Sequence, residues 1–165
     1  FSYDDEVICG NTRPKIEGVV GTSLNWKGLS LSLNFRYQLG ADVFNEALFN
    51  KVENISTEGL NKNQDKRALY ERWQKAGDIV RFKNIANAAS TPMSSRFVQE
   101  ENVLTLESVY LGYEFYDGWI QKLGLSNLKL QVSMRDVFRA SSIKSERGIS
   151  YPFARSLEAG LSFNF

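Results

Sequence analysis

The sequence predicts an all-β protein of about five antiparallel strands, each with one apolar and one polar face. Three observations carry this prediction. Apolar and polar residues alternate over long runs, and a Lys-Gly pair separates the first two runs. No segment approaches the ~18 apolar residues of a membrane-spanning helix. Aromatic residues make up 13% of the 165 residues, which is high for a mean hydropathy of −0.32.

The first two predicted strands form a hairpin over residues 16–39. Within residues 29–39 every odd position is apolar or aromatic and every even position is polar. Residues 16–26 alternate more weakly, and Lys27-Gly28 is short enough for a tight turn. Because successive side chains of a strand point to opposite faces, the hairpin has one apolar and one polar face.

Three further strands are expected within residues 103–165. Leu104 and Leu106 are out of phase with Val109, and a β-bulge between them would reconcile the two patterns. The remaining apolar positions follow one alternation in each strand. These positions are Val109, Leu111, Tyr113 and Phe115; Leu128, Leu130, Val132 and Met134; and Leu157, Ala159, Leu161, Phe163 and Phe165.

The connections between the strands alternate in length. Residues 27–28 and 116–126 are short connections, whereas residues 40–102 and 137–153 are longer. A structureless loop as long as 40–102 is unusual in a compact domain, so we expect a helix within it. Its residues would be Ala68, Leu69, Trp73 and Ala76, with Gly77 as the C-cap.

Alternation by itself leaves two architectures open. The apolar faces either pack together in a soluble β-sandwich or face lipid in an outer-membrane barrel with a wet lumen. Charged side chains on the polar faces, runs of about ten residues and aromatics at strand ends favour the barrel. The connection lengths also fit short periplasmic turns and long outer loops. Five strands cannot close a barrel, so this interpretation makes the chain part of a larger one.

Composition excludes several functions. A formal net charge of +1 argues against nucleic acid as a partner. The chain has no histidine and a single cysteine, which excludes histidine triads, histidine metal sites and an internal disulfide. We therefore expect no enzyme activity, no catalytic residue, no metal and no cofactor.

Five short motifs occur in order along the chain. They are Gly10–Lys15; Trp26–Leu31; Arg72–Asp78; Ser95–Val98 with Leu111–Phe115; and Tyr151–Ser156 with Gly160, Leu161 and Phe165. Together they resemble the C-terminal end of TonB-dependent outer-membrane transporters of the SusC/RagA type. Ala76 stands where the family pattern has proline, and Asp136 stands where it has asparagine.

The resemblance implies an antiparallel transmembrane β-barrel segment, about five strands of a 22-stranded, plugged barrel. Residues 1–15 would end an extracellular loop, 16–39 form a hairpin, 40–102 form a long extracellular loop, and 103–165 supply the last three strands. The plug domain would lie outside this chain. Such a transporter imports bulky nutrients, oligosaccharides or peptides, into the periplasm. The alternative is a soluble β-sandwich ligand-binding module that uses the long loop for recognition.

The resemblance also implies partners. These are the plug and remaining strands of the same transporter, a SusD-like surface lipoprotein, the TonB complex, the barrel-assembly machinery and membrane lipid. Leu161, Phe163 and Phe165 resemble the C-terminal signal read by the assembly machinery. The simpler interpretation of these three residues is a lipid-facing strand end.

Two further sets of residues are candidates for function. Tyr70 and Trp73, in the long loop, are candidate contacts for ligand or lid. The favoured alternative is that Trp73 anchors a small core within the loop. Arg36, Lys129, Arg135 and Glu158 are candidate lumen-facing residues. Their simpler role is a solvated wall with mutual ion pairing.

Overall fold

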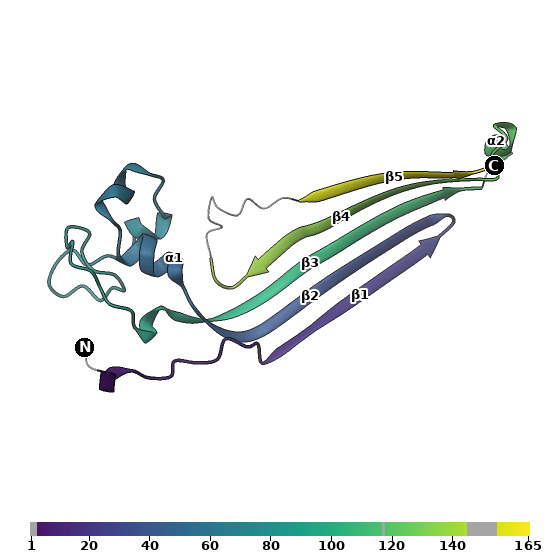
Figure 1. Cartoon of the computed structure of the whole chain (residues 1–165). Helices are drawn as coiled ribbons and strands as arrows, with labels where there is room; N and C mark the ends of the chain where they lie inside the picture. Colours follow the sequence, from purple (N-terminus) through teal and green to yellow (C-terminus); the bar gives the residue numbers. More distant parts are fainter. Residues whose placement is uncertain (1–2, 117, 145–154) are drawn as a thin grey trace. The chain divides into compact units, whose positions relative to one another are not determined.

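One antiparallel sheet organises the molecule. The computed structural model describes residues 3–116, 118–144 and 155–165. Five strands lie side by side in chain order (Figure 1). They are β1 (Ile16–Trp26), β2 (Leu29–Phe44), β3 (Val98–Phe115), β4 (Asn127–Ser141) and β5 (Ser156–Asn164). The predicted all-β fold and its five strands are therefore confirmed, and β1 has the predicted bounds.

The chain divides into two compact units. The first, here called the sheet unit, is built from Pro14–Gly40 and Asn102–Ser142 together with β5. The second, here called the loop unit, is centred on Ala41–Glu101. The long connection predicted between the second and third strands is thus a folded body of its own.

The turn between β1 and β2 explains the Lys27-Gly28 pair. Both residues have positive φ, 44° and 87°, as a two-residue hairpin turn of type I′ requires. The Gly28 carbonyl accepts a hydrogen bond of 2.8 Å from the Glu114 amide of β3. A Cβ on Gly28 would lie 2.4 Å from the Glu114 carbonyl oxygen, so this position has no room for a side chain.

Replacing Gly28 by valine is expected to destabilise the hairpin by about 1–3 kcal/mol, the usual cost of a strained left-handed conformation. The contact with Glu114 adds to that cost. The urea concentration at which the β-sheet circular dichroism is lost measures the effect. Gly118→Ala is the control, because a Cβ there meets no atom within 4 Å. Equal midpoints for Gly28→Val and the wild type would contradict the prediction.

The predicted bulge is present between β3 and β4. Their register shifts between Leu106 and Ser108. From Leu106 to Ser108, β3 advances two residues, while β4 advances three from Phe138 to Arg135, so the extra residue lies on β4. Asp136, at this point of β4, has a φ of 51°. The bulge was predicted from the β3 sequence, but the partner strand supplies the extra residue.

Two connections differ from the prediction. Residues 137–141 belong to β4 rather than to a loop, because residues 138–141 pair with residues 103–106 of β3. The motif residues 151–154 lie outside the described residues. The connection 116–126 contains a short helix, α2 (Gly118–Lys122), whose Ile120 is buried.

The loop unit has a hydrophobic core. Its centre consists of Leu48, Val52, Phe82 and Phe97, with Phe44 and Phe49 packed against them. The rings of Phe44, Phe49 and Phe97 meet edge to face, at centroid distances of 5.2–6.0 Å. The backbone around this core forms α1 (Glu46–Leu48), a π-helical turn Phe49–Glu53, and the 3-10 helices Thr57–Asn61, Lys66–Leu69 and Ser95–Phe97; a further 3-10 helix spans Tyr3–Asp5.

The prediction of a helix over residues 68–77 is wrong. Only the 3-10 turn Lys66–Leu69 forms, and Glu71 follows with a φ of 57°. The backbone of Arg72 and Trp73 then pairs with Phe82, whose carbonyl accepts a 2.9 Å bond from the Trp73 amide. A long-range backbone pairing therefore overrides the local helical pattern.

Candidate functional site

The sheet unit presents one continuous polar face. Strand register places Lys129 between Glu114 and Ser162, Arg135 between Ser108 and Ser156, and Glu158 beside Ser133. Asn34 of β2 donates a 2.9 Å hydrogen bond to Ser108 of β3, which joins the two halves of the face. The predicted polar residues Arg36, Lys129, Arg135 and Glu158 thus lie on one surface.

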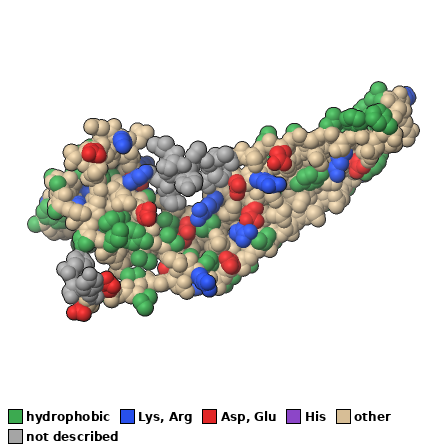
Figure 2. All heavy atoms as spheres, in the orientation of Figure 1, with side chains coloured by type: hydrophobic (Ala, Val, Ile, Leu, Met, Phe, Trp, Pro, Cys, Tyr) green, Lys and Arg blue, Asp and Glu red, His purple; other side chains and the backbone are tan. Residues whose placement is uncertain are grey.

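Ion pairing on this face involves residues that the alternation pattern did not single out. The Arg36 guanidinium forms an ion pair with Glu107, next to the bulge. The Ser133 hydroxyl donates a long hydrogen bond of 3.5 Å to the Glu158 carboxylate. Figure 2 shows Lys, Arg, Asp and Glu side chains of both signs interspersed along the sheet. This arrangement fits the inner wall of a water-filled lumen with no strong net charge.

The opposite face of the sheet unit is apolar and exposed. Paired residues form rows across the strands: Leu111–Val132–Ala159, Tyr113–Leu130–Leu161 and Phe115–Leu128–Phe163. In these rows Val132 and Leu161 keep 42% and 57% of their surface exposed. The described residues contain a single sheet, so they offer no second layer of the kind a β-sandwich needs. This arrangement favours a lipid-facing surface over the soluble alternative.

Aromatic side chains gather at the end of the sheet that carries the β1–β2 turn, α2 and the C-terminus. The Phe115 ring lies 4.6 Å from that of Tyr113 and 5.7 Å from that of Trp119, and the Phe163 and Phe165 rings are 5.6 Å apart. Figure 2 shows apolar side chains concentrated at the same end. Such a girdle suits a membrane–water interface, where Tyr and Trp side chains combine an apolar ring with a polar group.

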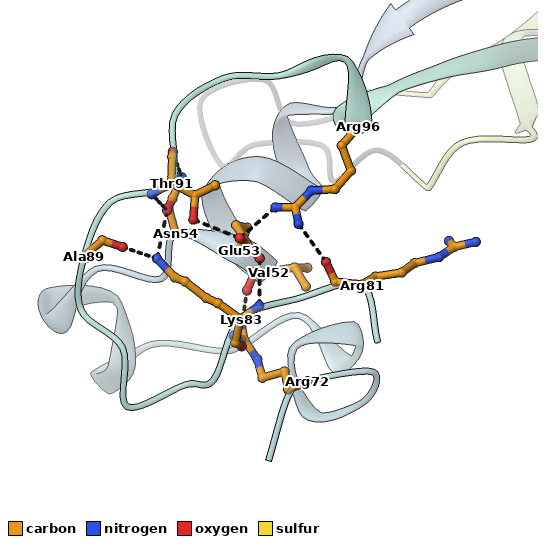
Figure 3. Close-up of polar contacts among 9 residues, drawn as sticks. All are labelled: Val52, Glu53, Asn54, Arg72, Arg81, Lys83, Ala89, Thr91 and Arg96. Carbon is orange, nitrogen blue, oxygen red and sulfur yellow. Dashed lines mark hydrogen bonds and ion pairs between the residues drawn. The ribbon is translucent and has the colours of Figure 1, made fainter. Parts of the chain in front are cut away.

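The loop unit is held together by a buried carboxylate, Glu53. Its Oε1 accepts hydrogen bonds from the Thr91 hydroxyl at 2.8 Å and from Arg96 at 2.7 Å. Its Oε2 accepts the Lys83 amide at 3.3 Å. Figure 3 shows these partners converging on Glu53 from three different segments of the loop. Since Glu53 is only 2% exposed, this network fixes the segments relative to one another.

Arg72 is another buried charge of the loop unit. Its guanidinium donates to three backbone carbonyls: Ala68 at 2.6 Å, Lys83 at 3.0 Å, and Val52. Within the same motif, the Asp78 carboxylate accepts the Gln74 and Lys75 amides at 3.0 Å each, around Gly77 with a φ of 98°. In the Arg-Trp…Gly-Asp motif, the arginine therefore binds backbone carbonyls, and the aspartate caps the turn that follows.

The structure does not place Trp73 in the loop core. Trp73 keeps 43% of its surface exposed and Tyr70 keeps 57%, whereas the neighbouring Arg72 is buried. The sequence pattern pointed to the aromatic residue of the motif, but the buried residue is its arginine, Arg72. Glu53 was also missed, because its partners come from residues 83–96 and no local pattern marks it.

The buried charges of the loop unit have shifted pKa values. Burial raises the pKa of Glu53, but hydrogen bonds from Thr91, Arg96 and Lys83 outweigh burial, and the pKa lies below its usual value. Hydrogen bonding from Arg67 lowers the pKa of Asp65 in the same way. Burial lowers the pKa of Arg72.

The loop unit is therefore expected to lose stability in acid. The unfolded chain binds a proton on Glu53 and Asp65 at a higher pH than the folded chain does. Their stabilising contribution is complete above the ordinary carboxyl pKa of about 4 and is lost as the pH falls through the lowered folded-state pKa. Trp73 fluorescence during urea unfolding measures this, with Trp26 and Trp119 replaced by phenylalanine. A midpoint that does not change between pH 7 and pH 3 would contradict the prediction.

Comparisons with known proteins agree with this geometry. No protein-family model matches the chain. The TonB-dependent receptor P39 of Formosa agariphila is 24% identical over 139 residues, which cover 82% of this chain and 13% of the receptor. The RagAB peptide importer has 20% identity and a TM-score of 0.68 in both its open-open and closed-closed states, over 88% of this chain and 16% of that chain. The chain is similar in sequence to part of a TonB-dependent receptor, and it has the fold of a segment of the RagAB importer.

The sheet unit therefore shares its fold with a segment of such an importer. A third structure, the RagAB peptide transporter, matches with 20% identity and a TM-score of 0.66. The chain spans about an eighth of the receptor and a sixth of the transporter chain. No helix in the described residues is long and apolar enough to cross a membrane. The described residues also hold no cluster of histidine, cysteine or acidic side chains that fits a metal ion.

Proposed function

We propose that this chain is part of a TonB-dependent outer-membrane importer, which brings bulky nutrients into the periplasm together with a SusD-like surface lipoprotein. The observation that carries the proposal is the two-faced sheet, which shares its fold with the RagAB importer over 88% of the chain. RagAB is a peptide importer, which favours peptides over oligosaccharides as the cargo.

In this proposal the sheet unit crosses the membrane and the loop unit lies outside the cell. The β1–β2 turn, α2 and the C-terminus face the periplasm, and Arg36, Lys129, Arg135 and Glu158 face the lumen. The exposed Tyr70 and Trp73 contact the cargo or the lipoprotein. Residues 1–15 and 40–102 serve as extracellular segments, and residues 16–39 and 103–165 supply the barrel strands.

The function is tested by deleting the full-length gene in its host. Growth on a peptide digest as the sole nitrogen source should fail in the deletion strain and return when the gene is restored. Restoration should require an intact TonB complex. Growth on oligosaccharides as the sole carbon source distinguishes the second cargo class. Unimpaired growth of the deletion strain on both nutrients would overturn the proposal.

Leu161, Phe163 and Phe165 act in this proposal as the C-terminal assembly signal. Leu161 and Phe163 pair with Leu130 and Leu128 of β4, and the exposed Phe165 ring packs beside that of Phe163. Deleting Phe165 from the full-length protein should lower its amount in outer-membrane fractions, as measured by immunoblot. Removal of the exposed Leu123 side chain (Leu123→Ala) is the control. An unchanged amount after deletion of Phe165 would contradict the assignment.

A further inference from the structure

A pocket of about 350 Å³ opens in the loop unit between residues 53–60 and 83–90. Its volume lies within the range of about 300–1,000 Å³ that is typical of small-ligand sites. The buried Glu53 and Arg72 line its inner side, and the Lys83 ammonium donates to the Asn54 side chain at 3.1 Å and to the Ala89 carbonyl (Figure 3). The buried side is therefore rigid, because each of its charged groups is already held by the protein.

The lining combines two kinds of surface. Four aliphatic residues contribute to it: Ile55, Leu60, Ile85 and Ala88. Leu60 and Ile85 keep 53% and 58% of their surface exposed, although the described loop unit has a core in which such residues could be buried. Amide and hydroxyl side chains complete the lining: Asn54, Ser56, Thr57, Asn87 and Ser90.

The charged lining residues are two cations and one anion. Lys83 has three N–H donors, and its two described side-chain bonds leave one for a ligand. Arg72 has five, of which three are used by backbone carbonyls. Since Glu53 is compensated by its own partners, the pocket offers more donors than acceptors to a ligand. A carbonyl or carboxylate oxygen fits this surplus.

We infer that this pocket binds a short stretch of peptide, with an aliphatic side chain against Leu60 and Ile85 and backbone carbonyls toward Lys83 and the lining amides. The lining contains no aromatic ring, and an aliphatic rim suits a branched side chain better than the flat face of a sugar. The inference rests on the proposed import function, and it assigns the loop unit a capture site for peptides.

Calorimetry on the purified full-length transporter tests the inference, with trileucine, triglycine and maltoheptaose as probes. The double variant Leu60→Asn/Ile85→Asn should weaken trileucine binding about tenfold, because it removes two apolar contacts. Ile79→Asn is the matched control, since Ile79 is fully exposed and outside the pocket. It should leave the affinity unchanged. The wild type should bind trileucine more tightly than triglycine.

Each other outcome overturns the capture site. For the wild type, these outcomes are no binding of trileucine and equal binding of trileucine and triglycine. For the double variant, they are a trileucine affinity equal to that of the wild type and a loss of affinity for maltoheptaose alone. Binding needs no energy from TonB, so the two proposals fail separately. Peptide import with unaltered binding by the double variant would refute the pocket alone. Peptide binding at the pocket without import would refute the transport function alone.

Discussion

Replacing Glu53 by alanine is expected to cost the loop unit about 3 kcal/mol, one of the two largest effects in this protein. The carboxylate is buried and accepts three hydrogen bonds, from Thr91, Arg96 and the Lys83 amide. Its removal leaves these donors without their acceptor, and a buried donor that loses its partner is destabilising. The midpoint of urea unfolding, followed by Trp73 fluorescence in the Trp26→Phe/Trp119→Phe background, measures the loss.

The matched control is Glu71→Ala. Glu71 forms a 3.8 Å ion pair with Arg81, and both side chains are more than half exposed, so its removal should not change the midpoint measurably. Glu53→Gln keeps the shape and one acceptor oxygen, and its midpoint should fall between those of the wild type and Glu53→Ala. A Glu53→Ala midpoint equal to that of Glu71→Ala would show that the buried network does not hold the unit together.

Placing a lysine on the apolar face of the sheet is expected to have an effect of similar size. Val132→Lys puts a charge in one of the rows of exposed apolar residues, between Leu111 and Ala159. In a lipid-facing barrel wall this costs about 2–4 kcal/mol near the bilayer midplane. The full-length variant should therefore be depleted from outer-membrane fractions, and the amount that assembles should unfold at lower urea concentration.

Ser133→Lys is the control for this prediction, because it introduces the same charge at the next residue of β4. Ser133 lies on the polar face beside Glu158, where a lysine has water and an opposite charge. Its level in the outer membrane should match the wild type. If both lysine variants assembled equally well, the assignment of the apolar face to lipid would be wrong.

Strand alternation predicted the sheet accurately because it depends on neighbouring residues alone. The bounds of β1 and the Lys27-Gly28 turn follow from period-2 patterning and from the positive φ that a tight turn needs. Two strands are longer than predicted, because they continue beyond their alternating residues. β2 extends to Phe44 and β3 begins at Val98, where the amide of Asn45 bonds the carbonyl of Phe97 at 2.8 Å.

The loop unit was beyond prediction from the sequence, for a different reason. A helix over residues 68–77 was expected from the spacing of its apolar residues. Backbone pairing with Phe82 and the hydrogen bonds of Arg72 to backbone carbonyls keep this segment extended instead. The order of the five motifs nevertheless indicated the SusC/RagA-like barrel, which the receptor and importer comparisons support.

The sequence by itself determined the two-faced strands and the hairpin turn, because each depends on residues that are neighbours along the chain. Only the tertiary structure decided which loop residues are buried and which remain exposed. Glu53 meets Thr91 and Arg96 across about forty residues, and Arg72 reaches Val52 across twenty. Contacts between residues so far apart along the chain leave no periodic pattern in the sequence. The buried charges, and the pocket beside them, therefore became visible only when the chain was folded.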